Sequence, residues 1–94
     1  MTNIDKLVNM SNPTLSPEQC RAARGLLGWT QSQLKEAAHV ARATLADFEA
    51  GKRTPYQRTL IDLRSALETA GVIFVDENGE GPGVRLRKQQ SKRT

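Results

Sequence analysis

The side chains that could do chemistry in this sequence favour binding over catalysis. Cys20 and His39 are each the only residue of their type, and neither fits a pattern of nucleophile and base. One cysteine cannot form an intramolecular disulfide, and one cysteine with one histidine is too few ligands for a zinc site without carboxylates. No glycine-rich phosphate loop precedes a helix pattern. We therefore expect no enzymatic activity, no cofactor and no metal site.

Cationic side chains are the other chemical resource, and they are unevenly placed. The 94-residue chain has 14 Lys and Arg against 10 Asp and Glu, giving a net charge of +4. Residues 16–58 hold seven basic and four acidic groups. Residues 59–83 hold one basic and five acidic groups, and the last eleven residues hold five basic groups and no acidic one. Such asymmetry suits a polyanion such as DNA. A solvated surface with a basic tail is the alternative.

The elements that position these charges begin with a helix expected at residues 17–27. Ser16 can cap this helix, Pro17 suits its first position, and Gln19 completes a capping box. Gly28 ends it, because glycine readily adopts the left-handed conformation that follows a helix.

Two shorter helices with a tight turn between them are expected next. Thr30 and Gln33 form a second capping box, so the first of these helices begins just after Thr30. Its apolar face is formed by Leu34, Ala37 and Ala38. After a break at residues 38–40 the helical spacing resumes, and it stops at Gly51.

A fourth helix and a β-hairpin complete the expected fold. Thr54, Pro55 and Gln57 repeat the order of cap, proline and glutamine, and the helix they begin runs to Gly71. Its apolar positions are Leu60, Ile61, Leu63, Leu67 and Ala70. Residues 72–75 and 84–87 then have strand patterns on either side of turn-forming residues.

The whole pattern predicts a mainly α fold: a four-to-five-helix bundle with a C-terminal β-hairpin extension. A lone hairpin is only marginally stable, so this one must pack on the helices or pair with another chain. Residues 1–15 are expected to be a flexible segment and residues 88–94 a basic disordered tail. The first fifteen residues lack the apolar stretch of a signal peptide, and no run of roughly 18 apolar residues occurs, so we expect a cytoplasmic protein without a membrane span.

Two opposite charges are expected to face the core. Arg24 shares a helix face with buried positions of the first helix, and Glu49 follows Phe48 on the buried side of the third. Because an isolated buried charge costs several kcal/mol, we expect Arg24 and Glu49 to form a salt bridge with a structural role.

The helix-turn-helix of phage Cro and repressor-type regulators is similar to residues 31–55, which read QSQLKEAAHVARATLADFEAGKRTP. The resemblance runs from Ser16 to Ala70, and family members also keep an Arg at the position of Arg24 and a Glu at that of Glu49. It implies a helix-turn-helix DNA-binding domain of the phage-repressor type at residues 16–71.

This sequence departs from the family pattern at two positions. The turn residue, usually Gly because its backbone is left-handed, is His39, a residue type enriched several-fold among non-Gly residues with positive φ. The usual Ser or Thr cap of the recognition helix is Ala41, and the loss of such a cap typically costs about 1 kcal/mol.

The resemblance assigns base reading to the second helix of the motif, whose N-terminal residues enter the major groove. The candidates are Arg42, Ala43, Thr44, Ala46 and Asp47. Arg42 can donate two hydrogen bonds to guanine, Asp47 can accept one from cytosine, and alanine methyl groups can contact thymine. The alternative for Arg42 is a phosphate contact or an interaction with the side chain four residues along the helix, and the alternative for Asp47 is a solvent-exposed carboxylate.

Phosphate contacts are expected at the start of the first motif helix and in the loop after the second. The candidates are Gln31, Gln33, Lys52, Arg53 and Arg58. Helix N-termini attract phosphate, although the capping box occupies Gln33, and three cations within seven residues suit the flank of a DNA site.

The functional expectation is a small transcriptional regulator, a repressor acting as a homodimer on double-stranded DNA with an inverted repeat. The hairpin is the candidate dimerisation element, because edge pairing across a two-fold axis would cover its apolar faces. Those faces are formed by Val72, Phe74, Val84 and Leu86. An antitoxin whose C-terminal hairpin holds a protein partner, or a helix-turn-helix used only for protein contact, is the alternative.

Overall fold

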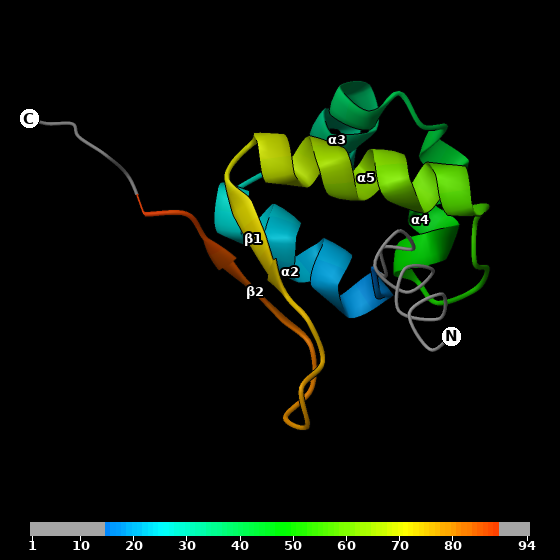
Figure 1. Ribbon diagram of the computed structural model, residues 1–94. Helices are drawn as coiled ribbons and strands as arrows, with labels where there is room; N and C mark the ends of the chain where they lie inside the picture. Colours follow the sequence, from blue (N-terminus) through cyan, green and yellow to red (C-terminus); the bar gives the residue numbers. More distant parts are fainter. Residues whose placement is uncertain (1–14, 89–94) are drawn as a thin grey trace, which may run out of the picture.

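The computed structural model describes residues 15–88. Along this part of the chain the elements are α2 (Pro17–Leu27), α3 (Gln31–Ala38), α4 (Arg42–Glu49), α5 (Gln57–Thr69), β1 (Val72–Val75) and β2 (Gly83–Leu86) (Figure 1). Four helices and a two-stranded antiparallel hairpin confirm the expected, mainly helical fold. The segments expected to be flexible or disordered were residues 1–15 and 88–94, and all of these except Leu15 and Lys88 lie outside the described residues.

The first two helices begin with the capping boxes that the sequence predicts. Ser16 Oγ accepts a hydrogen bond from the Gln19 N–H at 2.9 Å, and Gln19 Oε1 accepts one from the Ser16 N–H at 3.0 Å. Thr30 and Gln33 make the same reciprocal pair at α3. Gly28, at φ 71°, ends α2 in the left-handed conformation. The expected boundaries of α2 are therefore confirmed.

The expected start of α5 is wrong. Tyr56 is the N-cap residue, with φ −61° and ψ 154°, and no side chain caps the helix. Pro55 disfavours a helical conformation at Thr54, residues 53–56 belong to no helix, and the first turn forms at Gln57. Thr54 and Gln57 therefore do not make a capping box.

The core is mainly aliphatic, with Phe48 and Phe74 as its aromatic members, and it lies where the helices and β1 meet. Its fully buried members include Leu34, Leu45, Leu63, Leu67, Val72 and Cys20. Two residues expected in the apolar faces are exposed instead, Ala37 and Ile61. At about 100° of rotation per residue, Ile61 lies on the opposite side of α5 from Leu63, and α3 packs through Leu34 and Ala38.

The hairpin packs on the helices of its own chain. Val72 pairs with Leu86 and Phe74 with Val84, so these four side chains share one face of the hairpin. Val72 and Phe74 are buried in the core, and the Arg64 guanidinium lies 4.7 Å from the Phe74 ring centre. The expectation that a second chain covers Val72 and Phe74 is therefore wrong, because α2 and α5 cover them.

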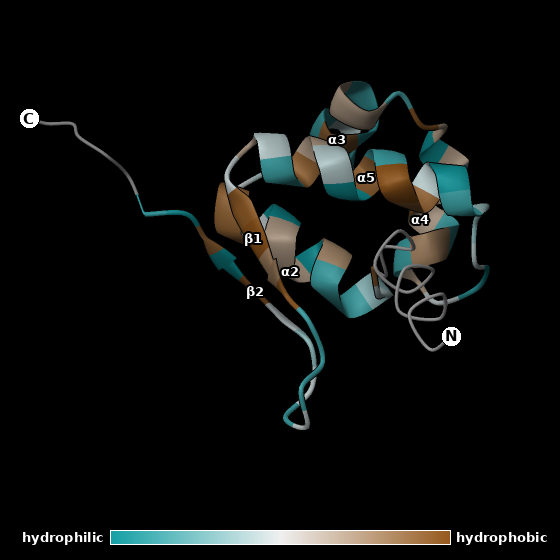
Figure 2. Cartoon of the chain, viewed as in Figure 1, coloured by the Kyte–Doolittle hydropathy of each residue, from teal (hydrophilic) through white to brown (hydrophobic). Residues whose placement is uncertain are grey.

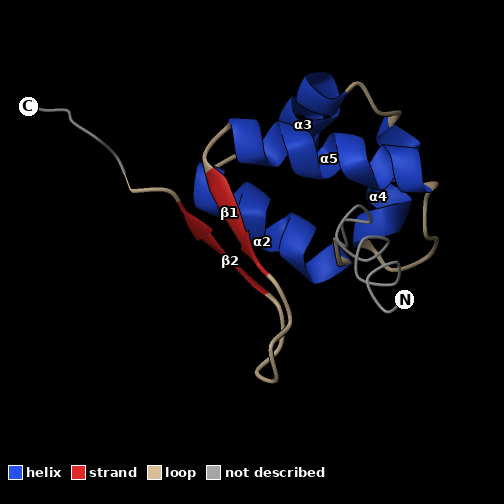
Figure 3. Cartoon of the chain, viewed as in Figure 1, coloured by secondary structure: helices blue, strands red, loops and turns tan. Residues whose placement is uncertain are grey.

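The hairpin lies far from α4 (Figure 3), and its hydropathy changes along its length (Figure 2). It lies on the side of α2 and α5 away from α4 (Figure 3), and its second strand begins at Gly83, one residue earlier than expected. β1 is largely hydrophobic, whereas the hairpin loop and the residues after β2 are hydrophilic (Figure 2).

Candidate nucleic-acid interface

A left-handed residue makes the tight turn between α3 and α4. His39 has φ 58° and ψ 49°, and among residues 15–88 it is the one residue other than glycine with positive φ. The backbone N–H groups of His39 and Val40 both donate to the Lys35 carbonyl, which ends α3. The left-handed conformation expected at His39 is confirmed. Ala41 is the N-cap of α4 and, as its side chain dictates, makes no cap hydrogen bond.

Buried side chains fix the rotation of α4 about its axis. Leu45, Phe48 and Glu49 face the interior. Arg42 and Ala43 are exposed at the opposite side, and Thr44, Ala46 and Asp47 are half-buried. The N-terminal turn of α4 therefore presents one long cation beside small side chains. A surface of this kind allows the helix backbone to approach another large molecule closely.

Glu49 anchors the other end of α4 through four hydrogen bonds to its carboxylate. Arg24 donates from Nη2 to Oε1 at 2.7 Å and from Nε to Oε2 at 2.8 Å, which is the geometry of the expected ion pair. Cys20 Sγ lies 3.0 Å from Oε2, and Gln31 Nε2 lies 2.9 Å from Oε1. Glu49 is only 3% exposed, so these partners replace the water that its charge loses.

The electrostatics of this cluster hold Glu49 ionised. Burial by itself would raise the pKa of Glu49, but the hydrogen bonds from Arg24, Gln31 and Cys20 outweigh it and leave the pKa below its ordinary value. The hydrogen bond to Glu49 raises the pKa of Arg24. Burial first, and then the hydrogen bond to Glu49, raise the pKa of Cys20, so its side chain remains a thiol. Cys20 is a buried structural residue rather than a nucleophile.

The cluster also positions a residue at the start of α3. Gln31 is the first residue of that helix, and one of its amide hydrogens is directed to Glu49. An amide nitrogen has two hydrogens, so one donor of Gln31 remains available at a helix N-terminus. Gln33 uses its carbonyl oxygen to accept from the Thr30 N–H at 2.8 Å, which leaves its amide hydrogens for another acceptor.

A loop rich in cations follows α4. Gly51, at φ 77°, turns the chain, and Lys52 and Arg53 are exposed beyond it. Arg58 is 82% exposed and lies 3.6 Å from Asp62, a weak surface pair that leaves the guanidinium free to change partner. Tyr56 is 87% exposed, and sequence reasoning missed it. Its signal was an aromatic residue outside the apolar spacing of α5.

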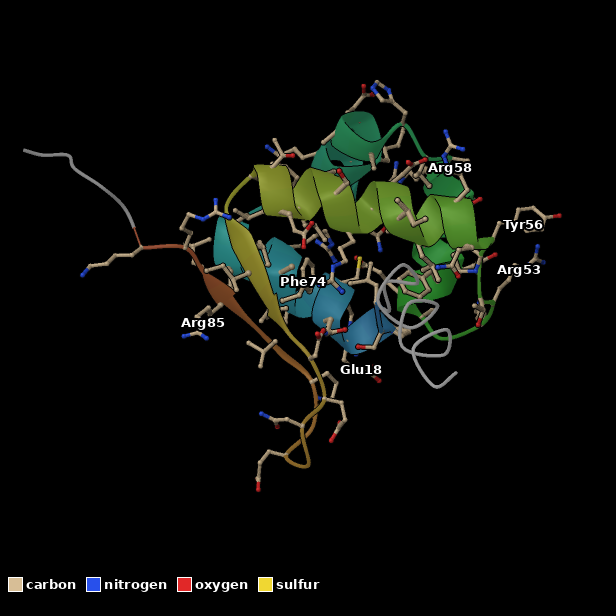
Figure 4. All side chains as sticks on the ribbon, in the orientation of Figure 1. Glu18, Arg53, Tyr56, Arg58, Phe74 and Arg85 are labelled. Carbon is tan, nitrogen blue, oxygen red and sulfur yellow. The ribbon has the colours of Figure 1, made fainter. Side chains whose placement is uncertain are left out.

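The side chains of Arg53, Tyr56 and Arg58 point away from the bundle at one end of α5 (Figure 4). Figure 4 places Arg53, Tyr56 and Arg58 together there, whereas Arg85 extends from the hairpin on the far side of the molecule. The structure thus brings Arg53 and Arg58 to the same end of the molecule and keeps Arg85 of β2 apart from them.

Comparison with protein-family models gives a helix-turn-helix match over residues 21–71, a little over half of the chain. The chain belongs to the Cro/C1-type helix-turn-helix family. Members of this family are DNA-binding regulators, and α3, the turn at His39 and α4 form the motif here. The match ends at Gly71 and does not include the hairpin. A search of curated proteins found no match.

Two further observations concern the described residues. Within residues 15–88 no helix is long and apolar enough to cross a membrane. The same part of the chain contains no group of three or more His, Cys, Asp or Glu side chains placed to hold a metal ion.

Proposed function

We propose that this member of the family is a sequence-specific transcriptional repressor that binds an inverted repeat in double-stranded DNA as a homodimer in the cytoplasm. The observation that carries the proposal is the orientation of α4. Its inner face is held by Leu45, Phe48 and the four hydrogen bonds to Glu49, so Arg42 and Ala43 must face outward.

Base reading is assigned to the outward side of α4, which would lie in the major groove. Arg42 would donate two parallel hydrogen bonds to guanine O6 and N7. Ala43 and Ala46 would contact thymine methyl groups, Thr44 would hydrogen-bond either base or backbone, and Asp47 would accept from a cytosine amino group. The short side chains between Arg42 and Asp47 suit the close approach that this geometry needs.

Contacts with the DNA backbone are assigned to two places, one before α4 in the chain and one after it. Gln31 and Gln33 offer amide hydrogens where the N-terminus of α3 already favours an anion. Lys52, Arg53 and Arg58 would neutralise phosphates on the flank of the site, with the Tyr56 hydroxyl as an added donor. These contacts would set affinity and register, while α4 would set sequence.

A single helix-turn-helix contacts about half of a useful operator, so a symmetric pair of copies would read two half-sites one helical turn apart. Repression would then follow from occupancy, because a protein bound across a promoter excludes polymerase from it.

Selection from a random pool of duplex DNA tests this proposal. We expect an enriched inverted repeat with half-site centres about 10 base pairs apart, and Arg42→Ala should relax the preference at one position in each half-site. Lys52→Ala is the matched control, because losing a phosphate contact weakens binding to all sequences alike. Selection that enriches no sequence would contradict the proposal and direct attention to a protein partner instead.

A further inference from the structure

The second strand of the hairpin has an open backbone edge. The Arg87 N–H donates to the Gly71 carbonyl at 2.6 Å, and antiparallel ladders bond inward at every second residue. The N–H and C=O groups of Val84 and Leu86 therefore point away from β1. No hydrogen bond to these four groups comes from any other backbone or side-chain group within residues 15–88.

A groove of about 360 Å³ runs beside this edge, between β2 and the first half of α2. Its helix side is formed by Ser16, Glu18, Gln19 and Ala22, and its strand side by Pro82, Gly83 and Val84. Gly83 carries no side chain to fill the space, and Gln19 Nε2 satisfies its carbonyl at 3.1 Å. Leu86 is 39% exposed next to the groove. An open edge with apolar lining suits an added strand.

Charge identifies the added strand as a second copy of β2. The loop end of the hairpin has exposed acidic side chains at Asp76, Glu77 and Glu80, and the other end has exposed cations at Arg85, Arg87 and Lys88. Among residues 15–88 no ion pair joins the two ends. Two hairpins paired antiparallel across a two-fold axis bring each acidic end beside the basic end of the other copy.

We propose that two copies of the chain pair through β2, with the two-fold axis at Val84. This deepens the homodimer of the proposed function by naming its interface. In this register the two Val84 residues exchange both hydrogen bonds, and each Leu86 N–H donates to the Pro82 carbonyl of the other copy. Pro82 has no N–H to donate, but in this register only its carbonyl is needed, as an acceptor, so proline is compatible with the position. Each Leu86 fills the groove beside Ala22 of the other copy.

Neighbouring registers are disfavoured by charge. An axis at Arg85 would place the two Arg85 side chains directly opposite each other, and an axis at Leu86 would place Arg85 opposite Arg87. The axis at Val84 instead places Arg85 opposite Gly83, and it brings Lys88 of each copy close to Glu80 of the other.

Sedimentation equilibrium of the full chain tests the interface. We expect a dimer at tens of micromolar, and Leu86→Gln should raise the dimer dissociation constant by about tenfold or more. Ile61→Gln is the matched control, because Ile61 is 37% exposed on α5, away from the hairpin, and should leave the constant unchanged. A monomeric wild-type chain, or a dimer indifferent to Leu86→Gln, would overturn the interface.

A charge exchange tests the register. Glu80→Lys and Lys88→Glu should each weaken the dimer several-fold, because each turns an attraction into a repulsion at two symmetric places, and the double variant should restore it. Combining Glu80→Lys with Arg87→Glu should restore much less, since successive side chains lie on opposite faces of a strand. Equal recovery in both double variants would contradict the register.

Two further variants distinguish pairing through β2 from a groove filled by residues 1–14 and from a failure of DNA binding. Deletion of residues 1–14 should leave the dimer unchanged, and a dimer that forms only after this deletion would identify that segment as the occupant of the groove and overturn the interface. Arg42→Ala should still dimerise, and Leu86→Gln should still bind a single half-site. Dimer without DNA binding would contradict the proposed function alone, and half-site binding without a dimer would contradict the interface alone.

Discussion

The two ends of α4 differ in how their polar groups are satisfied. At the C-terminal end, Glu49 is buried and its carboxylate accepts hydrogen bonds from three side chains. At the N-terminal end, Ala41 provides no cap and Arg42 is exposed beside the exposed Ala43. The difference indicates that the two ends of this eight-residue helix have different roles. The C-terminal end holds the helix on the bundle, and the N-terminal end remains available for a ligand.

The largest effect is expected from breaking the buried end. Glu49→Ala leaves Arg24 without its partner, so the free energy of unfolding should fall by about 3–5 kcal/mol. Urea denaturation followed by circular dichroism measures this loss. Asp62→Ala is the control, because the exposed pair with Arg58 should contribute less than about 1 kcal/mol. A loss below about 1 kcal/mol for Glu49→Ala would mean that the cluster is no more than a surface pair.

Removing the exposed cations that follow α4 should change binding and leave the free energy of unfolding unchanged. Replacing Lys52, Arg53 and Arg58 together by alanine should weaken DNA affinity at least tenfold, and the slope of log affinity against log salt should become shallower by roughly 0.9 for each lost phosphate contact. The free energy of unfolding, measured by urea denaturation, should stay within about 0.5 kcal/mol of that of the parent chain, because these side chains are exposed. Unchanged affinity with an unchanged salt slope would remove the loop from the interface.

The buried end should also set the response to pH. Folding lowers the pKa of Glu49, so the stability from its ionised form is fully present above the unfolded value of about 4.3 and is lost as pH falls through the lower folded value. Folding raises the pKa of Cys20, so its contribution is lost as pH rises above about 8.5. Unfolding measured from acid to alkaline pH checks both. Glu49→Gln should flatten the acid limb, and an acid limb as steep as in the parent chain would assign that limb to other carboxyl groups.

The sequence predicted most of the fold because local signals and burial agree there. The capping boxes at Ser16 and Thr30 fixed two helix starts, and the charges of Arg24 and Glu49 on apolar faces identified the ion pair that the structure contains. The predicted start of α5 was wrong. The residues around Pro55 match a capping pattern, but Tyr56 has an extended backbone and the helix therefore begins only after it.

Parts of the candidate site were beyond the reach of spacing rules. The hydrogen bond from Gln31 to Glu49 joins residues 18 positions apart and depends on how α3 and α4 pack. The exposure of Tyr56 likewise depends on where α5 begins. Sequence periodicity assigns faces to single helices, whereas these two features arise between elements.

The smallest effect is expected from adding to α4 the side-chain N-cap that α2 and α3 already have. Ala41→Ser supplies a hydroxyl at a position whose backbone, at φ −63° and ψ 140°, is already that of an N-cap, so the chain should gain about 1 kcal/mol of stability. Urea denaturation measures the gain, and Ala43→Ser, inside the first turn of the helix, is the control that should not stabilise. If both variants behave alike, the missing cap is not what distinguishes the two ends. If Ala41→Ser stabilises the chain and DNA affinity is unchanged, the exposed end depends on its outward side chains rather than on fraying of the helix.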